Sequence, residues 1–487
     1  MNRILIIAIV GFIIIAAVVA AVSLRGGRNN KTKQTTQTRD VNELTIWRAA
    51  DSAESFKDAI AAYTQDKQGI KINVVTKTPA DFENESLSAL SAGKGPDIWS
   101  IPASWLPKHA DKLKPAPDNL LNPNPDVKVS NSDLVKQLYA PIVAEEVVGQ
   151  DGKVYGLPLA LDTLVVFANT DLVRQRFGEL SKNGELKNPD LYTLGPRTWD
   201  ELIELSQALT VKDGGTIRRP GIALGTATNN PRAAQILAAM MLQNQTQMVS
   251  ADRASATFHL PARKSTGEQF YPGTNALEFF TSFADEKSNR YSWNATLPDA
   301  RELFIKGELP LLIEFSHFGA VIKQRSPEFA TRMWALPQVR GSVKPVDYGE
   351  YFVETVTKDA ANEQLAWDFI RFMAFQGARL YQLSSGRPPA LKVEVVPQNI
   401  LERATFGSPN QFQQQSAKPW YRGKSPEKVE AAFGEMIDDV AAGRLAPQPA
   451  IERAAAQVSG LLRKDTGISP APIIQPQLVP GGASGDR

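Results

Sequence analysis

The stretch that decides the fold is Val154-Tyr-Gly-Leu-Pro-Leu-Ala-Leu-Asp-Thr-Leu-Val-Val-Phe-Ala-Asn-Thr-Asp-Leu172. Its apolar run 164–168 is typical of a strand buried on both faces, and the short side chain of Asn169 can end the strand and cap a helix. Asp162 should then lie at the strand edge beside a loop, although a solvated loop aspartate fits this window equally well. We expect the chain to form two lobes that are hinged near this stretch.

Length and composition agree with two lobes and exclude several functions. A chain of 487 residues exceeds the size at which one hydrophobic core stops growing. A net charge of +2 argues against a general nucleic-acid binder, which needs a concentrated basic face. The absence of cysteine excludes disulfides, thiolate metal sites and thiol nucleophiles. Only His109, His259 and His317 supply imidazoles, at spacings that favour no metal site, so we expect no cofactor.

The N-terminus carries a membrane segment at 4–24, an almost unbroken apolar run. About twenty such residues are the length that a helix needs to cross a bilayer, and the run exceeds the usual signal-peptide core. We therefore expect a retained anchor, with cleavage after the small pair Ala21 and Ser23 as the alternative. No lipid-modified cysteine is possible.

The charges around this segment conflict with an external domain. Arg3 alone precedes the segment, whereas five basic residues follow it between 25 and 39, and basic residues prefer the cytoplasmic side. Long domains that follow an N-terminal span are exceptions to this rule, and we expect the domain outside.

The body begins with a strand–helix–strand pattern. Residues 44–47 form a short strand candidate, Asp51 and Glu54 have the spacing of a capping box, and an alternating strand follows at 70–75. Such units predict a mainly parallel sheet whose functional loops lie at the carboxyl ends of the strands. Thr198 and Glu201 form a second capping box, at the start of a helix.

Candidate ligand contacts follow from these strand ends. Trp47 ends the first strand, and the loop after 98–101 carries Ser104 and Trp105, although packing between or within lobes would also explain these tryptophans. The strand 309–315 brings Glu314 to its exit, followed by His317, which could equally be a satisfied core or capping histidine.

Three further candidates lie next to other expected elements. Asn229 belongs to a polar turn before a helix, Tyr351 lies in an expected strand at 346–357, and Trp420 precedes a helix that begins at Ser425-Pro426.

Four patches in the body share the pattern of one known family: Gly95-Pro96-Asp97-Ile98, Tyr155-Gly156-Leu157-Pro158 through Asp162-Thr163 to Asn169-Thr170-Asp171-Leu172, Phe304-Ile305-Lys306-Gly307-Glu308, and Asn362 with Ala366-Trp367-Asp368-Phe369-Ile370. They span nearly all of 43–467 and resemble the extracellular solute-binding proteins of ABC importers, in the branch of the maltose-binding protein and other sugar binders.

The resemblance implies an α/β, periplasmic-binding-protein-like fold of two lobes, each a mainly parallel sheet flanked by helices, which close around a sugar by hinge bending. Asp162 falls where the family places an acidic sugar contact, 101–105 where residues line the cleft, His317 where an aromatic often stacks, and Trp420 near another stacking residue. The expected layout is an anchor at 1–24, a stalk at 25–42, lobe 1 at 43–161 and 353–400, lobe 2 at 162–352 and 401–467, and a disordered tail at 468–487.

The expected function is capture of a sugar outside the cell, as a monomer, for delivery to ABC permease subunits. Two alternatives use the same side chains. One is a surface carbohydrate-binding or sensing module, and the other is a glycoside hydrolase with Asp162 and Glu314 as its carboxylate pair.

Overall fold

The computed structural model describes residues 40–392, apart from 50, 123, 125, 127 and 265, and residues 410–466. The expected membrane segment at 4–24, the expected tail at 468–487 and all but three residues of the expected stalk lie outside this range, as do 393–409 of the predicted lobes. Among the described residues, no helix is both long and apolar enough to cross a membrane. The described residues from Val41 onward belong to one compact unit.

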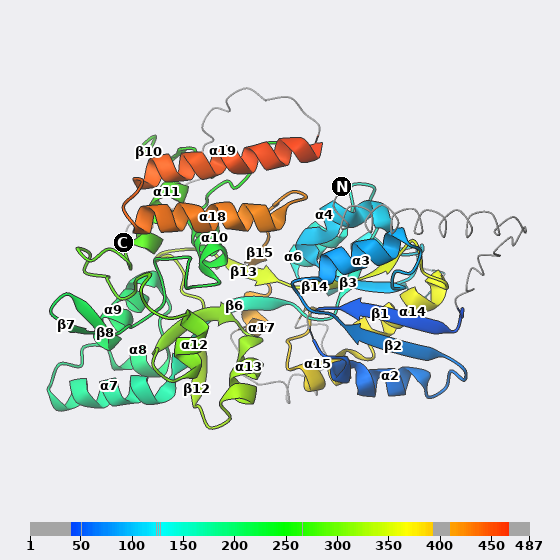
Figure 1. Ribbon diagram of the computed structural model, residues 1–487, viewed down its shortest axis with the longest axis horizontal. Coiled ribbons are helices and arrows are strands. Elements are labelled where there is room, and N and C mark those ends of the chain that lie inside the picture. The colour runs from blue at the N-terminus through cyan, green and yellow to red at the C-terminus, as the bar shows by residue number, and fades with distance from the viewer. Residues whose placement is uncertain are drawn as a thin grey trace, which may run out of the picture. The chain divides into compact units, whose positions relative to one another are not determined.

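Lobe 1 is built on a six-stranded sheet in the order β2-β1-β3-β14-β4, with β5 also paired to β14. Its strands are β1 (Glu43–Arg48), β2 (Lys71–Thr76), β3 (Ile98–Pro102), β4 (Leu113–Lys114), β5 (Leu157–Pro158) and β14 (Phe352–Thr357). In Figure 1, α2 (Lys57–Thr64) and α15 (Ala378–Ser385) lie on one side of this sheet, and α3 (Phe82–Ser91) and α4 (Leu106–His109) lie on the other. The other α-helices among the described residues of lobe 1 are α5 (Asn131–Leu138), α6 (Pro141–Val147) and α14 (Glu363–Ala374).

Lobe 2 is built on a five-stranded sheet in the order β11-β6-β13-β15, with β12 also paired to β6. Its strands are β6 (Asp162–Asn169), β11 (Leu311–Phe315), β12 (Thr331–Ala335), β13 (Asp347–Glu350) and β15 (Ala417–Lys418), and two hairpins join β7 (Val211–Asp213) to β8 (Thr216–Arg219) and β9 (Ala262–Arg263) to β10 (Gln269–Phe270). Its helices are α7 (Thr170–Lys182), α8 (Pro189–Thr193), α9 (Trp199–Leu209), α10 (Ala233–Gln243), α11 (Pro272–Thr281), α12 (Ala300–Ile305), α13 (Phe318–Arg325), α17 (Asn410–Gln413), α18 (Pro426–Ala441) and α19 (Pro447–Thr466).

Each lobe has its own apolar core, and β6 is the strand around which lobe 2 packs. All eight residues of β6 are buried, as its apolar pattern predicts, and Asn169 caps α7 by accepting hydrogen bonds from the backbone of Asp171 and Leu172. The core of lobe 2 extends from Leu164 to Leu462 and includes α18 and α19. A separate cluster contains Leu44, Trp99 and Trp367 and forms the core of lobe 1.

The prediction of a mainly parallel sheet in each lobe is wrong. β1 is parallel to β2 and β3, but β14 is antiparallel to all three of its partners. In lobe 2, β6 is antiparallel to β11, β12 and β13. The cause is the direction in which the chain crosses between the lobes: β6 and β14 start at the junction, whereas β3, β11 and β12 end there.

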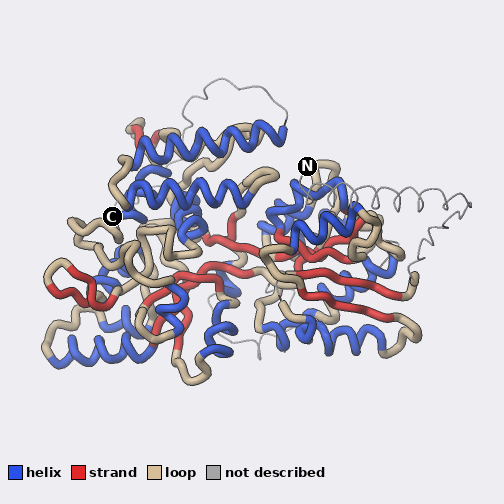
Figure 2. The backbone as a smooth tube through the Cα atoms, viewed as in Figure 1, coloured by secondary structure: helices blue, strands red, loops and turns tan. Residues whose placement is uncertain are grey.

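Two described crossings therefore bring the sheets together, as Figure 2 shows in the middle of the molecule. The first runs from β5 to β6. The second is Tyr351, which separates β13 of lobe 2 from β14 of lobe 1, so the single strand expected at 346–357 is two strands in different sheets. Gln414 joins the first crossing to the segment beside it by donating to the carbonyls of Leu161 and Pro389.

The two predicted capping boxes have different outcomes. The box of Thr198 and Glu201 is confirmed, with both reciprocal hydrogen bonds present. The box of Asp51 and Glu54 is wrong, because a short 3-10 helix at Ala53–Phe56 precedes α2 and Asp51 instead binds arginines at the junction. A buried cation competes for a carboxylate more strongly than a backbone amide does.

We predict opposite effects of alanine at two glycines. A Cβ at Gly156 would lie 2.3 Å from the side chain of Val353 and 2.7 Å from the backbone oxygen of Glu354, whereas a Cβ at Gly178, inside α7, would meet nothing within 4 Å. Gly156→Ala should lower the free energy of unfolding by about 1–3 kcal/mol, and Gly178→Ala should raise it by about 0.5–1 kcal/mol. Urea unfolding followed by circular dichroism measures both, and an equally stable Gly156→Ala protein would contradict this packing.

Candidate functional site

A chain of alternating charges crosses the junction between the lobes. Glu354 accepts from Arg48 (3.1 Å), Arg48 donates to Asp51 (2.9 Å), and Asp51 accepts from Arg387 (2.6 Å). Arg387 of lobe 1 then reaches Asp162 at the start of β6 (3.4 Å), and Asp162 accepts from Nδ1 of His317 (2.7 Å). These six residues are called the charge chain below. They lie where β1 and β11 end and where β6 and β14 begin.

Asp162 is the link of the charge chain that touches both lobes. Its side chain is buried, and it accepts hydrogen bonds from the hydroxyl of Ser316 and the backbone amide of His317 in addition to those from His317 Nδ1 and Arg387. Burial alone would raise the pKa of Asp162, but the charge and hydrogen bond of His317, with Arg387 and Ser316, outweigh it, so this pKa is lowered. Because an ionised carboxylate only accepts, His317 holds its proton on Nδ1.

Glu314, three residues before His317 in the sequence, is a second buried carboxylate. It accepts from Nε of Arg232 (2.6 Å) and Nε of Arg301 (2.5 Å). Burial raises its pKa, but the two guanidinium groups outweigh the burial and the pKa is lowered. Neither Glu314 nor Asp162 is thus available as the protonated acid that a glycoside hydrolase requires.

A large cavity lies between the lobes. Its volume is about 750 Å³, and both lobes supply its wall. Lobe 1 contributes the start of α4, the end of α6 and the loop up to Tyr155, and lobe 2 contributes the end of α10, the loop to Arg253 and the segment 419–423. We call this space the inter-lobe cavity. By contrast, the space beside Asp162 and Arg387 measures only about 10 Å³.

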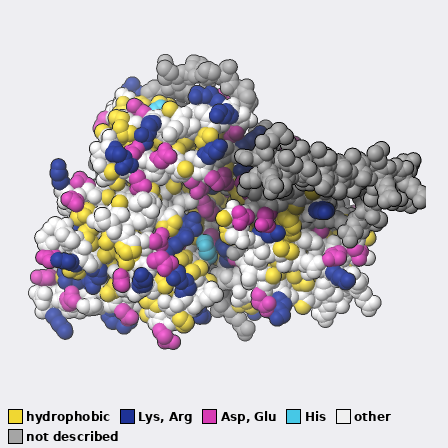
Figure 3. All heavy atoms as spheres, viewed as in Figure 1, with side chains coloured by type: hydrophobic (Ala, Val, Ile, Leu, Met, Phe, Trp, Pro, Cys, Tyr) yellow, Lys and Arg dark blue, Asp and Glu magenta, His cyan; other side chains and the backbone are white. Residues whose placement is uncertain are grey.

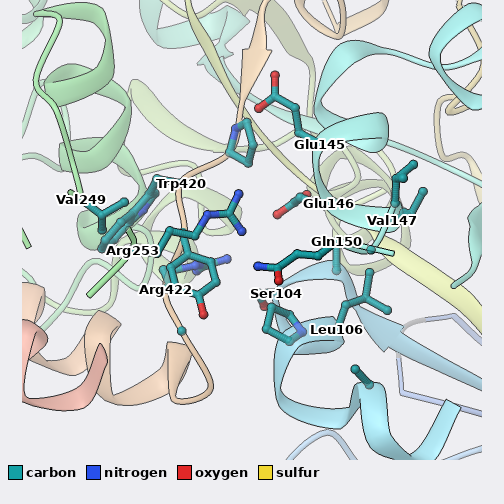
Figure 4. A pocket seen from close by; sticks show the side chains of 18 of the residues that line it. Ser104, Leu106, Glu145, Glu146, Val147, Gln150, Val249, Arg253, Trp420 and Arg422 are labelled. Atoms are coloured by element: carbon teal, nitrogen blue, oxygen red, sulfur yellow. The ribbon is translucent and has the colours of Figure 1, made fainter. Parts of the chain in front are cut away.

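The walls of the inter-lobe cavity carry different chemistry, as Figure 4 shows. Glu146 and Gln150 point into the cavity from lobe 1 and face Arg253 and Arg422 of lobe 2. Trp420 forms an aromatic part of the lobe 2 wall and packs against Phe258 and Phe433 behind it. The arrangement combines aromatic faces with hydrogen-bonding groups, as small-molecule sites commonly do.

One polar contact joins the two lobes beside this cavity. Trp105 donates from Nε1 to Glu427 in the first turn of α18 (2.5 Å), and Lys108 lies 3.8 Å from the same carboxylate. Both residues of lobe 1 follow the end of β3. On the face drawn in Figure 3, charged side chains of both signs gather where the lobes meet.

The structure divides the predicted site residues into three groups. Ser104 and Trp420 line the inter-lobe cavity, and Trp105 makes the contact between lobes just described. Asp162 and His317 touch each other in the charge chain, and Tyr351 lies beside them at the second crossing.

The other three predicted residues lie apart from the cavity. Trp47 is half-buried on β1, with the ammonium of Lys77 at 4.2 Å from its ring centroid. Asn229 is buried in lobe 2, where its amide donates to the backbone carbonyls of Asn294 and Leu297. Glu314 is enclosed by its two arginines. Their role as ligand contacts stays a prediction.

Several cavity residues had no signal in the sequence. Glu145, Glu146 and Gln150 belong to a stretch that reads as an ordinary helix end, and Arg253 belongs to a polar loop. Only the pair Trp420-Tyr421 offered a signal, because it places a second aromatic residue next to the predicted contact Trp420, just before a helix. Among the described residues, no group of acidic or histidine side chains could hold a metal ion.

Comparison with known proteins assigns the fold and the family. Residues 58–398 match the family model of bacterial extracellular solute-binding proteins. The galactooligosaccharide-binding protein of Bacillus subtilis (strain 168) is 32% identical over 146 residues, which are 30% of this chain and 31% of that protein. The chain thus matches less than a third of the length of this curated relative.

Solved structures agree on the two-lobed fold. The cyclic alpha-maltosyl-1,6-maltose binding protein of Arthrobacter globiformis has a TM-score of 0.68 at 20% identity and covers 87% of this chain and 99% of its own. The sugar-binding protein MalE of Xanthomonas citri has a TM-score of 0.66 at 17% identity and covers 87% of this chain and 98% of its own. The predicted family resemblance and two-lobed α/β fold are therefore confirmed.

We predict that Asp162→Asn destabilises the protein only where the carboxylate is ionised. A carboxylate whose pKa is lower in the folded than in the unfolded protein stabilises the fold above the unfolded-state pKa of about 3.9. This stabilisation is lost as the pH falls through the folded-state pKa. The variant should lose about 3 kcal/mol at pH 7, since it leaves His317 without its carboxylate and Arg387 with Asp51 alone, and the loss should shrink below about pH 4. Urea unfolding between pH 3.5 and 8 measures this difference.

Glu328→Gln is the matched control, because Glu328 is exposed. It should change stability by less than about 0.5 kcal/mol at every pH. A loss in Asp162→Asn that is the same at pH 3.5 and pH 7 would contradict the ionised state of Asp162.

Proposed function

The chain belongs to the bacterial extracellular solute-binding protein family, and from this premise we propose that it captures a sugar or oligosaccharide between its lobes and delivers it to the membrane subunits of an ABC importer. The family consists of binding proteins, so the chain is not an enzyme. Two of the proteins compared above are named for a ligand, a galactooligosaccharide in one and a cyclic maltosyl-maltose in the other, which supports a sugar as the ligand class.

The observation that carries this proposal is the inter-lobe cavity. Its volume of about 750 Å³ lies in the range of roughly 300–1,000 Å³ found for small-molecule sites. Both lobes line it, so a molecule bound there contacts both and favours their closed arrangement.

The chemistry of the cavity wall suits a sugar. Pyranose rings present C–H patches that pack on aromatic faces, and their hydroxyls pair with carboxylates, amides and guanidinium groups. Trp420 and Tyr421 supply aromatic rings, while Ser104, Glu146 and Gln150 supply polar groups from the opposite lobe. We assign the sugar contacts to these residues.

The charge chain has a different part in this proposal. The acceptor positions of Asp162 are occupied by Ser316, His317 and Arg387, so we assign Asp162 to holding the junction and not to contacting the sugar. Trp105 and Glu427 would close the lobes over the bound sugar. The hinge then bends at the two crossings, close to the charge chain.

The cellular arrangement completes the proposal. We propose that residues 4–24 anchor a monomer in the cell membrane, that 25–42 are a linker, and that the two lobes lie outside. The predicted lobe limits at 43–161 with 353–400, and 162–352 with 401–467, stay part of the proposal; the two separate cores support them, except that Tyr351 and Ala417 belong to the core of lobe 1. Digestion of the domain by protease added to intact cells would support this orientation, and protection would contradict it.

We predict that the full-length protein, in detergent, binds at least one oligosaccharide of a broad panel, with a change in tryptophan fluorescence. Gln150→Ala removes an exposed amide of the cavity wall and should weaken binding about three- to tenfold, the cost of roughly one hydrogen bond. Trp420→Ala should weaken it about tenfold or more through loss of the aromatic face.

Tyr271→Ala is the matched control, because this exposed aromatic precedes α11 and does not line the cavity. It should leave binding unchanged. If Gln150→Ala binds as tightly as the parent protein and His317→Ala abolishes binding, the assignment to the cavity is wrong. The sugar would then bind at the charge chain.

A further inference from the structure

A second contact between the lobes lies beside the inter-lobe cavity, apart from the charge chain. The indole Nε1 of Trp105 in lobe 1 donates to the carboxylate of Glu427 in lobe 2 (2.5 Å). Nζ of Lys108 lies 3.8 Å from the other oxygen of the same carboxylate. Ser104 and Leu106, the sequence neighbours of Trp105, line the lobe 1 wall, so the contact joins the lobes next to the cavity.

The donor of this contact is held in place within lobe 1. The ring of Trp105 stacks on Phe82, with centroids 6.1 Å apart and planes at 22°, and meets the edge of the His109 ring at 5.8 Å. Phe82 itself belongs to the core of lobe 1. The Nε1–H group therefore has a fixed direction before lobe 2 approaches it, and little side-chain entropy is lost when the bond forms.

The cation of this contact is held by lobe 1 as well. Nζ of Lys108 pairs with Glu83 at 2.5 Å and lies 5.7 Å from the ring centroid of Trp105. Glu83 also binds Nε2 of His109 at 2.8 Å. The charge of Lys108 is thus shared between a carboxylate of each lobe, and the hydrogen bond from Trp105 is the stronger link to lobe 2.

The acceptor in lobe 2 is fixed by α18. Glu427 is the second residue of this helix, after Pro426, and Val429 in the same turn is buried in the core of lobe 2. A carboxylate in the first turn of a helix also interacts favourably with the helix dipole. Neither side of the contact has to be reordered, so the bond forms or breaks as the two lobes move as rigid bodies.

Solvent exposure keeps the contact weak enough to be broken. The side chain of Glu427 is 52% exposed and that of Lys108 is 26% exposed. Exposed ion pairs contribute little, whereas a hydrogen bond to a charged group contributes more when its donor is fixed and half-buried, as Trp105 is. A contact of this strength shifts the balance between open and closed lobes several-fold without locking it.

Resting on the proposed function, we propose that Trp105, Lys108 and Glu427 form a latch that favours closed lobes independently of the sugar. The latch keeps part of the ligand-free protein closed. Once a sugar is bound, the latch must open before the sugar can leave. It therefore raises the affinity, because a larger fraction of the protein is already in the binding-competent arrangement, and it slows release.

Opening of the latch is measurable on the full-length protein, in detergent and without a sugar. The chain contains no cysteine, so spin labels can be attached at Asp111→Cys in lobe 1 and Ala456→Cys on α19 of lobe 2, both at exposed positions. Glu427→Ala removes the acceptor, and Trp105→Phe removes the N–H donor but keeps an aromatic ring. Each should lower the ratio of closed to open protein about three- to tenfold, seen by electron double resonance as a shift to longer distances.

The double variant and a matched control decide whether one shared bond is responsible. Glu427→Ala and Trp105→Phe together should open the lobes no further than either alone, because both remove the same bond. Glu435→Ala removes another exposed carboxylate of α18 and should leave the distances unchanged. Unchanged distances in both latch variants, or effects that add in full in the double variant, would overturn the latch.

A second measurement separates the latch from the proposed function. With a sugar that the broad panel identifies, Glu427→Ala should speed release about three- to tenfold, followed by tryptophan fluorescence after dilution. Sugar binding whose release rate is the same in Glu427→Ala and the parent protein would overturn the part of the latch in release. Failure of every sugar in the panel, with lobes that still open in the latch variants, would overturn the proposed function and leave the contact between the lobes in place.

Discussion

The structure depends on the bond between Arg387 and Asp162, the one link of the charge chain that crosses from lobe 1 to lobe 2. The other links of Arg48, Asp51 and Glu354 lie within lobe 1 and measure 2.6–3.1 Å, whereas the crossing link measures 3.4 Å. Buried ion pairs contribute little net stability, but loss of one partner is costly. The crossing link is thus the longest of the charge chain, and it lies beside the two crossings at which we propose that the lobes bend.

The same junction explains which features of the fold were predictable from the sequence. The apolar run of β6 and the short polar Asn169 after it are local signals, and both were interpreted correctly. Strand direction is not a local property, because an apolar strand buried on both faces looks the same whether its neighbours are parallel or antiparallel. Direction is set by where the chain crosses, and a crossing such as Tyr351, a single residue inside an apparently continuous strand, has no signature of its own.

The candidate site was predictable only in part for a related reason. Ser104 and Trp420 were predicted because each lies beside the end of an expected element, and both line the inter-lobe cavity; their contact with a ligand stays a prediction. Asn229 and Glu314 have the same kind of signal but serve the inside of lobe 2, since a buried backbone carbonyl or guanidinium binds them first. Glu146 gave no signal, because a glutamate at a helix end is ordinary until a second lobe faces it.

The cavity and the charge chain are neighbours, and Tyr351 connects them. This residue lines the small space beside Asp162 and Arg387, and its hydroxyl hydrogen-bonds Glu146 on the cavity side. A ligand shifts the equilibrium between open and closed lobes only by as much as its affinity differs between them. Contacts with α6 alone exist in both arrangements and shift nothing. In the proposed assignment, the contacts of a sugar with both Glu146 of lobe 1 and the aromatic wall at 420–421 of lobe 2 form only in the closed arrangement, so their binding energy favours closure.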